Sequence, residues 1–557
     1  MEKRIKLPIG VTDFREIISK RCYYIDKTHA ISELIEDGSQ SILFTRPRRF
    51  GKTTFQSMLR AFFDIREDNR DIFDGLEIME DTVAVENWMN KVPVIYLTLK
   101  DVDGLDFDSA FNMLKGKLTS LFQDYDFISV PSDDEEGMIF RNMCKGRATT
   151  GDASRSLEIL AKLLYKHYGK KVIILIDEYD VPLDKAEKNG YYTEMLSLMR
   201  TMLLSVLKDC PYTEKGILTG CLRISKESLF TGLNNLSVHS VTSAQYADAF
   251  GFTEAEVAKL LEDAGLEDKA GIIQDWYDGY NIGKEHIYTP WDVISYVNIL
   301  QYDPDALPEN YWANSSGNDA IIRLIEVAGD GVRNGYSSLI EGRTIKKPIN
   351  QTLTYSNLYT SAANIWSLLL MTGYLTLAGR YNPNGETELK LPNEEIRYLF
   401  ASLVDEWFAE KVGRSDRKGF FEAIWRGDIK ELTEIISKYL VGTISYYDYK
   451  EDYYHAFLAG LLSGAGYEVR SNRETGTGRA DVMIFNSETL SAAIFEVKRS
   501  KSEEEMEEDA EKALKQIEER SYGSDLQGYK HIIRYGVAFY QKEAIAKTTD
   551  YAMNNLK

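Results

Sequence analysis

The sequence predicts an α/β protein of several domains, with a mostly parallel sheet near the N-terminus, a helical middle region and a small α/β domain at the C-terminus. Its 557 residues exceed what one hydrophobic core usually supports. Short apolar runs alternate with amphipathic stretches over residues 1–250, whereas residues 251–437 have the pattern of aromatic-rich helices. Over residues 438–557 the expected order is helix, strand, strand, helix, strand.

The first region begins with a strand, a loop and a helix. Residues 41–45 (SILFT) are a short apolar run, a turn with arginines and a glycine follows, and TTFQSMLRAFF continues with helical periodicity. Further apolar runs start at Val92, Val172 and Gly216, and the stretch 110–122 is amphipathic. Because strands that alternate with helices usually pair in parallel, we expect a mostly parallel sheet here.

Aromatic helical segments dominate the middle of the sequence. Examples are GIIQDWYDGYNIG from Gly271 and TPWDVISYVNIL from Thr289, and we expect an all-helical lid or connector. The last domain contains two β-like segments, ADVMIF and AAIFEVK, then a Glu-rich helix and the strand HIIRYGVAFY. We expect these elements to form a separate small domain.

The composition is that of a folded globular protein. Hydrophobic residues make up 44% of the chain and prolines number only 12, which excludes a disordered or collagen-like chain. The 66 Lys and Arg residues against 87 Asp and Glu residues give a net charge of −21. Since the molecule as a whole repels polyanions, any nucleic-acid site must be a local basic patch.

The cysteines and the apolar runs bear on the compartment. Cys22, Cys144, Cys210 and Cys221 form no CxxC pair and have no histidine at zinc-ligand spacing, so we expect reduced structural thiols. The N-terminal segment lacks a signal-peptide pattern, and no run reaches transmembrane length. We therefore expect a cytoplasmic protein without a membrane partner.

Residues 46–54 (RPRRFGKTT) lie between the first apolar strand and its helix, the context of a phosphate-binding loop. Backbone N–H groups there would hold a phosphate, Gly51 would allow close approach, Lys52 would reach the β- and γ-phosphates, and Thr53 would bind Mg²⁺. Arg49 and Thr54 complete the predicted ATP-binding set. We expect Lys52 to be an exposed loop side chain. Arg46 occupies the first glycine position of GxxxxGK[ST], a departure from that pattern.

An acidic pair ends the apolar strand that starts at Val172. Asp177 would hold Mg²⁺ through water, Glu178 would polarise the attacking water, and Asp180 is a spare carboxylate. Arg223, after the next strand, is placed where it could sense the γ-phosphate. The alternative is a chance helix cap and an ordinary strand end. The two motifs in correct strand context favour the nucleotide site.

A second set of charged residues lies near the C-terminus. Asp481 opens one predicted strand, while Glu496 and Lys498 close the next and point to one face of it. The carboxylates suit Mg²⁺, with Mn²⁺ as a substitute, and Lys498 could orient the attacking water. Gln516 is a candidate outer ligand, whereas His455 and Glu474 fit ordinary surface roles better. The alternative for D…ExK is a solvated cross-strand pair, but the apolar neighbours favour a site.

With both sets located, the chain resembles the bacterial family that joins an AAA-ATPase-like domain to a C-terminal PD-(D/E)XK nuclease-like domain of the RecB-like group. The words that carry the resemblance are LPIGVTDFREII, YYIDKT, FTRPRRFGKTT, IDEYD, LTGCLRISKESLFTGLNNL, WYDGY, YWANSSGND, GRAD…FEVK and KALKQIEERSY. The resemblance implies a P-loop ATPase domain, a restriction-endonuclease-like domain and a usual arginine at position 46. It carries nuclease roles to Asp481, Glu496, Lys498 and Gln516. Tyr522 lies six residues after Gln516 rather than the four of QxxxY.

Three functions compete at this point. The first is an ATPase whose nucleotide state controls a metal-dependent nuclease, with DNA favoured over RNA. The second is a signalling or scaffold ATPase whose nuclease-like domain binds without cutting, and the third is an assembly module with both sites silent. An arginine acting across an interface, Arg223 or the pair Arg48 and Arg49, would imply a homo-oligomer. Basic residues around the C-terminal set could contact nucleic acid: Arg470, Arg473, Arg479, Lys498, Arg499 and Lys501.

Overall fold

The computed structural model divides the chain into two compact units. One comprises residues 1–320 and 342–397, and the other comprises residues 321–341 and 398–557. The structure describes all residues except 1–3, 131–133, 223–228, 231–234, 313–334, 336–337, 341, 352, 355–357, 359–360, 401, 404–417, 444–450, 463–466, 472–480, 488, 520–525, 527, 542 and 553–557. No helix within the described ranges has the length and apolar character needed to cross a membrane.

The first unit is built on a parallel sheet, as the sequence predicts. Its described strands lie in the order β2-β3-β4-β1-β5, and each strand is parallel to its neighbours. The strands are β1 (Ser41–Thr45), β2 (Val94–Thr98), β3 (Val172–Asp177), β4 (Thr213–Gly220) and β5 (Leu236–His239). Strand β4 lies between β1 and β3, so the ends of these three strands meet at one edge of the sheet.

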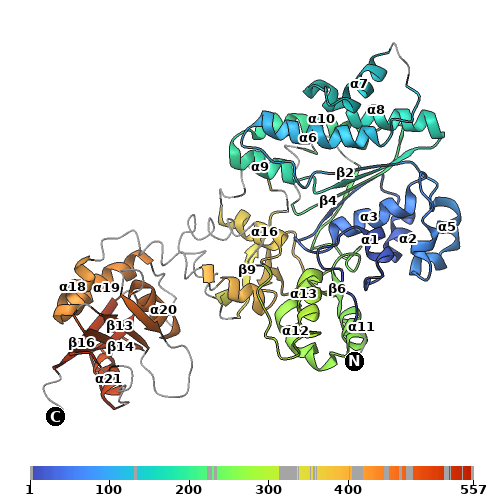
Figure 1. Ribbon diagram of the computed structural model, residues 1–557. Coiled ribbons are helices and arrows are strands. Elements are labelled where there is room, and N and C mark those ends of the chain that lie inside the picture. The colour runs from blue at the N-terminus through green and yellow to red at the C-terminus, as the bar shows by residue number, and fades with distance from the viewer. Residues whose placement is uncertain are drawn as a thin grey trace. The chain divides into compact units, whose positions relative to one another are not determined.

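Helices cover both faces of this sheet (Figure 1). Alternate residues of β3 face opposite ways: Ile174 and Ile176 belong to one apolar cluster, and Ile173 and Leu175 to the other. The helices are α1 (Phe14–Ser19), α2 (His29–Glu36), α3 (Lys52–Phe63), α4 (Arg70–Phe73), α5 (Thr82–Trp88), α6 (Phe107–Gln123), α7 (Glu135–Cys144), α8 (Thr150–Tyr168), α9 (Val181–Asn189) and α10 (Tyr192–Leu207), with the 3₁₀ turn η1 (Glu77–Glu80). Burial on both faces explains why these strands are continuously apolar.

The middle of the chain differs from the all-helical expectation. Two antiparallel sheets of three described strands, β6-β8-β7 and β10-β11-β9, accompany the expected helices in the first unit. The strands are β6 (Phe252–Thr253), β7 (Tyr280–Ile282), β8 (Glu285–Tyr288), β9 (Ile345–Pro348), β10 (Thr376–Leu377) and β11 (Glu386–Lys390). The helical elements are α11 (Glu254–Ala264), η2 (Glu267–Lys269), α12 (Ala270–Tyr277), α13 (Pro290–Leu300) and α16 (Ala362–Thr372). Strands this short give little periodicity, which is why the pattern of the sequence missed them.

The second unit contains a mixed sheet in the order β12-β13-β14-β15-β16, in which β14 and β15 are parallel. Its elements are α18 (Lys418–Arg426), α19 (Ile429–Thr443), α20 (Glu451–Leu462), β12 (Glu468–Ser471), β13 (Val482–Asn486), β14 (Ser491–Arg499), α21 (Met506–Glu519), β15 (His531–Tyr540) and β16 (Glu543–Ala552). Figure 1 shows α21 on one side of this sheet and α18, α19 and α20 on the other. The boundary expected at residue 438 falls inside α19.

Candidate functional site

The loop between β1 and α3 has a backbone that few side chains adopt. Gly51, the residue before α3, has a φ of 83°, and Arg49 has a φ of 68°. A Cβ atom added at Gly51 would meet nothing within 4 Å. Glycine is therefore needed here for its left-handed conformation and not to avoid crowding. This conformation places the N-terminus of α3 against the loop.

Lys52 contacts the loop itself. Its Nζ donates to the carbonyl oxygens of Arg46 at 3.1 Å and Pro47 at 2.9 Å, and lies 3.4 Å from Cys221 Sγ. The expectation of an exposed lysine is wrong, because only 5% of Lys52 is exposed. An ammonium held by neutral carbonyls remains available to a stronger anionic partner such as a phosphate.

Asp177 joins the loop helix to the neighbouring strands. Thr53 Oγ1 donates to its Oδ2 at 2.9 Å, and Thr219 Oγ1 on β4 donates to its Oδ1 at 2.7 Å. Asp177 is fully buried. The structure thus brings together the predicted pair Thr53 and Asp177. Their hydroxyl and carboxylate oxygens are metal ligands of the kind that Mg²⁺ prefers.

Glu178 and Asp180 have different environments. Glu178 has a φ of 53°, and burial raises the pKa of its carboxyl, an effect that Lys52 opposes and the charge of Asp177 reinforces. Asp180 accepts hydrogen bonds from the backbone N–H groups of Cys221 at 2.8 Å and Leu222 at 2.9 Å. Asp180 therefore fixes the chain after β4 and is not a spare carboxylate.

Arg46 has a structural role at the first position of the loop. Its buried guanidinium donates to the carbonyl oxygens of His239 at 2.9 Å and Tyr246 at 2.8 Å. Burial lowers the pKa of Arg46 to about 9. The arginine at the glycine position thus links the end of β1 to the end of β5 and to the segment that follows it.

The loop and the residues after β3 line a cavity of about 690 Å³. The predicted site residues that line it are Arg49, Gly51, Lys52, Thr53, Thr54 and Glu178. Asp177 is the one predicted ATP-binding residue outside the lining, and it contacts Thr53. The volume is in the range of pockets that bind small molecules. Arg223 lies outside the described residues, so its predicted role remains a prediction.

The C-terminal set lies on one face of the second unit's sheet. Val482, the first residue of β13, pairs with Phe495, so Asp481 just before β13 lies next to Glu496 within β14. The Val497 N–H donates to Asp481 Oδ2 at 2.8 Å. Glu496 is 2% exposed, and Lys498, two residues further along, is half-buried on the same face. The hairpin therefore gathers the three residues as the sequence predicts, and their carboxylate oxygens are suitable Mg²⁺ or Mn²⁺ ligands.

Helix α21 completes this face. Gln516 Nε2 donates to Glu496 Oε1. The helix approaches β15 closely at Gly536, where an added Cβ would lie 2.1 Å from the Ala510 carbonyl oxygen. Gly536 pairs with Glu496 across the parallel strands. A glycine on β15 thus allows the helix to bring its amide to the carboxylate.

The remaining predicted members contribute less. His455 Nε2 contacts the backbone oxygen of Asp481 at 2.7 Å and so supports the chain at the start of β13. Arg470 packs over the Phe485 ring, and Arg499 and Lys501 are exposed. Four residues lie outside the described part of the chain: Arg473, Glu474, Arg479 and Tyr522.

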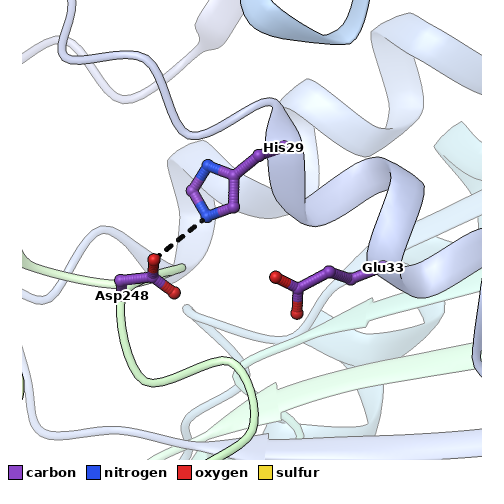
Figure 2. A group of neighbouring side chains, drawn as sticks. All are labelled: His29, Glu33 and Asp248. Atoms are coloured by element: carbon purple, nitrogen blue, oxygen red, sulfur yellow. Dashed lines mark ion pairs between the residues drawn. The ribbon is translucent and has the colours of Figure 1, made fainter. Parts of the chain in front are cut away.

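A third group of titratable side chains lies in the first unit (Figure 2). His29 and Glu33 come from α2, and Asp248 faces them from the segment after β5. His29 Nε2 is 3.6 Å from an Asp248 oxygen. This interaction raises the pKa of His29 and lowers that of Asp248. The ion pair of His29 with Asp248 thus links α2 to this segment.

Comparisons with known proteins match two regions of the chain. Residues 8–230 match the family described as predicted AAA-ATPase, and residues 449–549 match the PD-(D/E)XK nuclease superfamily. The chain carries an AAA-ATPase-like domain and a PD-(D/E)XK nuclease-superfamily domain. The nucleotide loop, Asp177 and Glu178 lie within the first match, and Asp481, Glu496 and Lys498 lie within the second.

Two individual proteins are also similar. An uncharacterized protein from the vnfD 5′ region of Azotobacter chroococcum mcd 1 is 27% identical over 513 residues, which is 89% of each chain. The ORC2 protein of Aeropyrum pernix, solved with ADPNP and ADP, is 13% identical. That match covers 72% of this chain and 97% of the ORC2 chain with a TM-score of 0.22, too low to carry an argument.

Sequence reasoning missed two residues that build these sites. Thr219 in the AAA-ATPase-like domain looks in the sequence like any polar residue at a strand end. Its place before Gly220, at the end of a buried strand, could have indicated a site residue. Gly536 in the nuclease-superfamily domain interrupts the apolar strand HIIRYGVAFY. A glycine inside a strand often marks a close backbone approach, which is what the structure has there.

Proposed function

We propose that the protein binds and hydrolyses ATP in the cavity of the AAA-ATPase-like domain, and that the nucleotide state controls a metal-dependent nuclease in the C-terminal domain. The observation that most supports the first half is the contact of Thr53 with Asp177 beside a loop that holds Lys52. The second half is supported by the gathering of Asp481, Glu496 and Lys498 at one end of a hairpin.

At the nucleotide site each side chain has a definite task. Bound Mg²⁺, held at Thr53 and Asp177, would neutralise charge on the phosphates. Lys52 exchanges its carbonyl partners for phosphate oxygens and stabilises the charge that develops there. Glu178 orients the attacking water and accepts its proton, a role that suits a partly buried carboxylate with a raised pKa.

At the C-terminal site the carboxylates and the lysine act together. Mg²⁺ or Mn²⁺ held by Asp481 and Glu496 would supply Lewis-acid chemistry at a phosphodiester. Gln516 keeps the Glu496 carboxylate in place. Lys498 orients the water and offsets charge in the transition state.

The favoured substrate is DNA. The exposed residues Arg499 and Lys501 lie just beyond Lys498 and supply positive charge next to the site. Because the whole chain has a net charge of −21, we expect contact with a short stretch of backbone at this patch and not an extended coat.

The test is incubation of the purified full-length chain with linear, circular and single-stranded DNA and with RNA, with and without Mg²⁺ and ATP. We expect Mg²⁺-dependent cleavage of DNA whose rate changes with ATP. Cleavage by Glu496→Ala equal to that of the parent would show that a contaminating nuclease is responsible.

If ATP is hydrolysed but no nucleic acid is cut under any condition, the nuclease proposal fails and a second function replaces it. In that case the protein is a signalling or scaffold ATPase whose nuclease-like domain binds nucleic acid or a protein partner. Retention of DNA by the parent but not by Arg499→Ala with Lys501→Ala would then identify nucleic acid as the ligand.

A further inference from the structure

The Arg49 side chain links the phosphate-binding loop to the middle of the chain. Its Nη1 donates to the Tyr311 carbonyl oxygen at 2.5 Å and lies 3.5 Å from Asp292 Oδ1 on α13. The guanidinium carbon is also 5.6 Å from the centre of the Trp291 ring. All three contacts are to residues beyond the parallel sheet, although Arg49 itself lines the nucleotide cavity.

Two buried carboxyl groups lie behind this arginine. Asp292 and Glu395 are both fully buried, and Glu395 Oε1 accepts a hydrogen bond from the Trp312 N–H at 2.7 Å. Burial raises the pKa of both carboxyls, and the charge of Asp292 raises that of Glu395 further. Arg49 opposes this shift at both groups. One cation facing two carboxyls is balanced when the pair holds one proton.

Within the described residues, the other titratable groups that act on the pair are phenols. They come from α12, β7 and the segment before Trp312, and burial raises the pKa of each: Tyr277, Tyr280 and Tyr311. These phenols remain neutral near pH 7, so the charge of the cluster depends on Arg49 and the two carboxyls. Removal of the guanidinium would leave a buried carboxylate without its counterion, which is costly unless it binds a proton.

We propose that Arg49 is a nucleotide-responsive positioning residue: a phosphate in the cavity draws its guanidinium away from Asp292, and the pair of Asp292 and Glu395 takes up a proton from solvent in exchange. This inference rests on the proposed nucleotide site. Because Glu395 also accepts a hydrogen bond from the Trp312 N–H, the exchange carries the nucleotide state to Trp312, which lines the same cavity. Trp312 lies far from the loop in sequence. The exchange would therefore link the phosphate-binding loop to a segment outside the parallel sheet.

The experiment is calorimetric titration of the full-length protein with Mg·ADP at pH 7.5 in buffers of different ionisation enthalpy. The dependence of the binding heat on the buffer gives the number of protons exchanged. We expect the parent to take up more protons than Asp292→Asn by a difference of up to about one, since one buried carboxyl is protonated. Protons from the nucleotide itself cancel in this difference.

The linkage has a defined sign. A complex that holds an extra proton is favoured at low pH, so the affinity of the parent for Mg·ADP should fall as pH rises, by up to about tenfold per pH unit more than in Asp292→Asn. Arg49→Gln should lose the excess uptake as well, and its partly exposed side chain makes it the safer variant if Asp292→Asn fails to fold.

Asp278→Asn is the matched control. Asp278 is a buried carboxyl with a pKa raised by burial, and Arg49 is not among the groups that act on it most strongly. It should keep the uptake of the parent. Equal uptake by the parent and both cluster variants, with binding intact, would overturn this inference and leave the nucleotide site standing. Absence of binding heat in the parent with Mg·ADP and Mg·ATP would overturn the nucleotide site and this inference together.

Discussion

The two sites are assembled in different ways. In the AAA-ATPase-like domain, Thr53 and Asp177 are far apart in sequence and meet because parallel strands end at one edge of a sheet. In the nuclease-superfamily domain, Asp481 and Glu496 are neighbours across one hairpin. The first site depends on long-range strand pairing, whereas the second depends on a local hairpin and on the packing of α21. Changes to packing should therefore affect the two activities separately.

The sites also differ in what must move. Lys52 contacts loop carbonyls and, in the proposed site, would have to change partners when a phosphate binds. At the C-terminal site the Glu496 carboxylate already has its amide partner, and Lys498 already lies on the same face. The nucleotide site is thus the one expected to respond to its ligand with a change of contacts.

The largest expected effect is at the nucleotide site. Lys52→Ala should lower ATP hydrolysis by about 100-fold or more, because it removes the cation that stabilises the developing charge. Its loop hydrogen bonds are lost too, so thermal unfolding must be measured beside the steady-state ATPase rate. DNA cleavage without nucleotide should stay within a few-fold of the parent. Hydrolysis within a few-fold of the parent would remove Lys52 from the site.

A comparable effect is expected at the C-terminal site. Asp481→Ala, Glu496→Ala and Lys498→Ala should each lower Mg²⁺-dependent cleavage by about 100-fold and leave ATP hydrolysis intact. Calorimetry with Mn²⁺ separates their roles. The carboxylate variants should bind Mn²⁺ more weakly, and Lys498→Ala should bind it as the parent does. If Lys498→Ala also loses Mn²⁺ binding, the lysine supports the fold of the site.

A packing change should distinguish the domains. Gly536→Ala puts a methyl group 2.1 Å from the Ala510 carbonyl oxygen, so we expect a loss of about 1–3 kcal/mol in the stability of the C-terminal domain. Because α21 carries Gln516, cleavage should fall as well, while ATP hydrolysis should not. Measuring thermal unfolding of the variant together with its rates of DNA cleavage and ATP hydrolysis checks this prediction. A variant as stable as the parent would mean that α21 shifts at no cost.

The smallest expected effect is on pH dependence. Burial raises the pKa of Glu178, and the protonated acid cannot accept a proton from water, so ATP hydrolysis should rise with pH through this raised pKa and then level off. The expected change is about tenfold per pH unit below that pKa. Glu178→Gln should bind ATP but show a low rate without this rise. An unchanged profile in Glu178→Gln would assign the titration to another group.

Local chemistry explains how much the sequence could predict. Patterns of a few residues in the correct strand context predict the first strand, its loop and helix α3. The same kind of pattern predicts both sets of charged residues. The roles of Arg46 and Arg49 could not be predicted, because their partners His239 and Asp292 lie in distant segments. The short middle strands were missed for lack of periodicity, although Gly279 and Gly283 on either side of β7 are turn signals.

The most direct test of the whole account is a separation-of-function measurement on Glu178→Gln and Glu496→Ala with linear DNA, Mg²⁺ and ATP. The account predicts that Glu178→Gln binds but does not turn over ATP and still cuts DNA at a rate fixed by the ATP-bound state. It predicts that Glu496→Ala hydrolyses ATP at the parent rate and does not cut. Two results would contradict the account of two separate but linked active sites. One is that both variants lose both activities while they remain folded, and the other is that Glu496→Ala cuts DNA as the parent does.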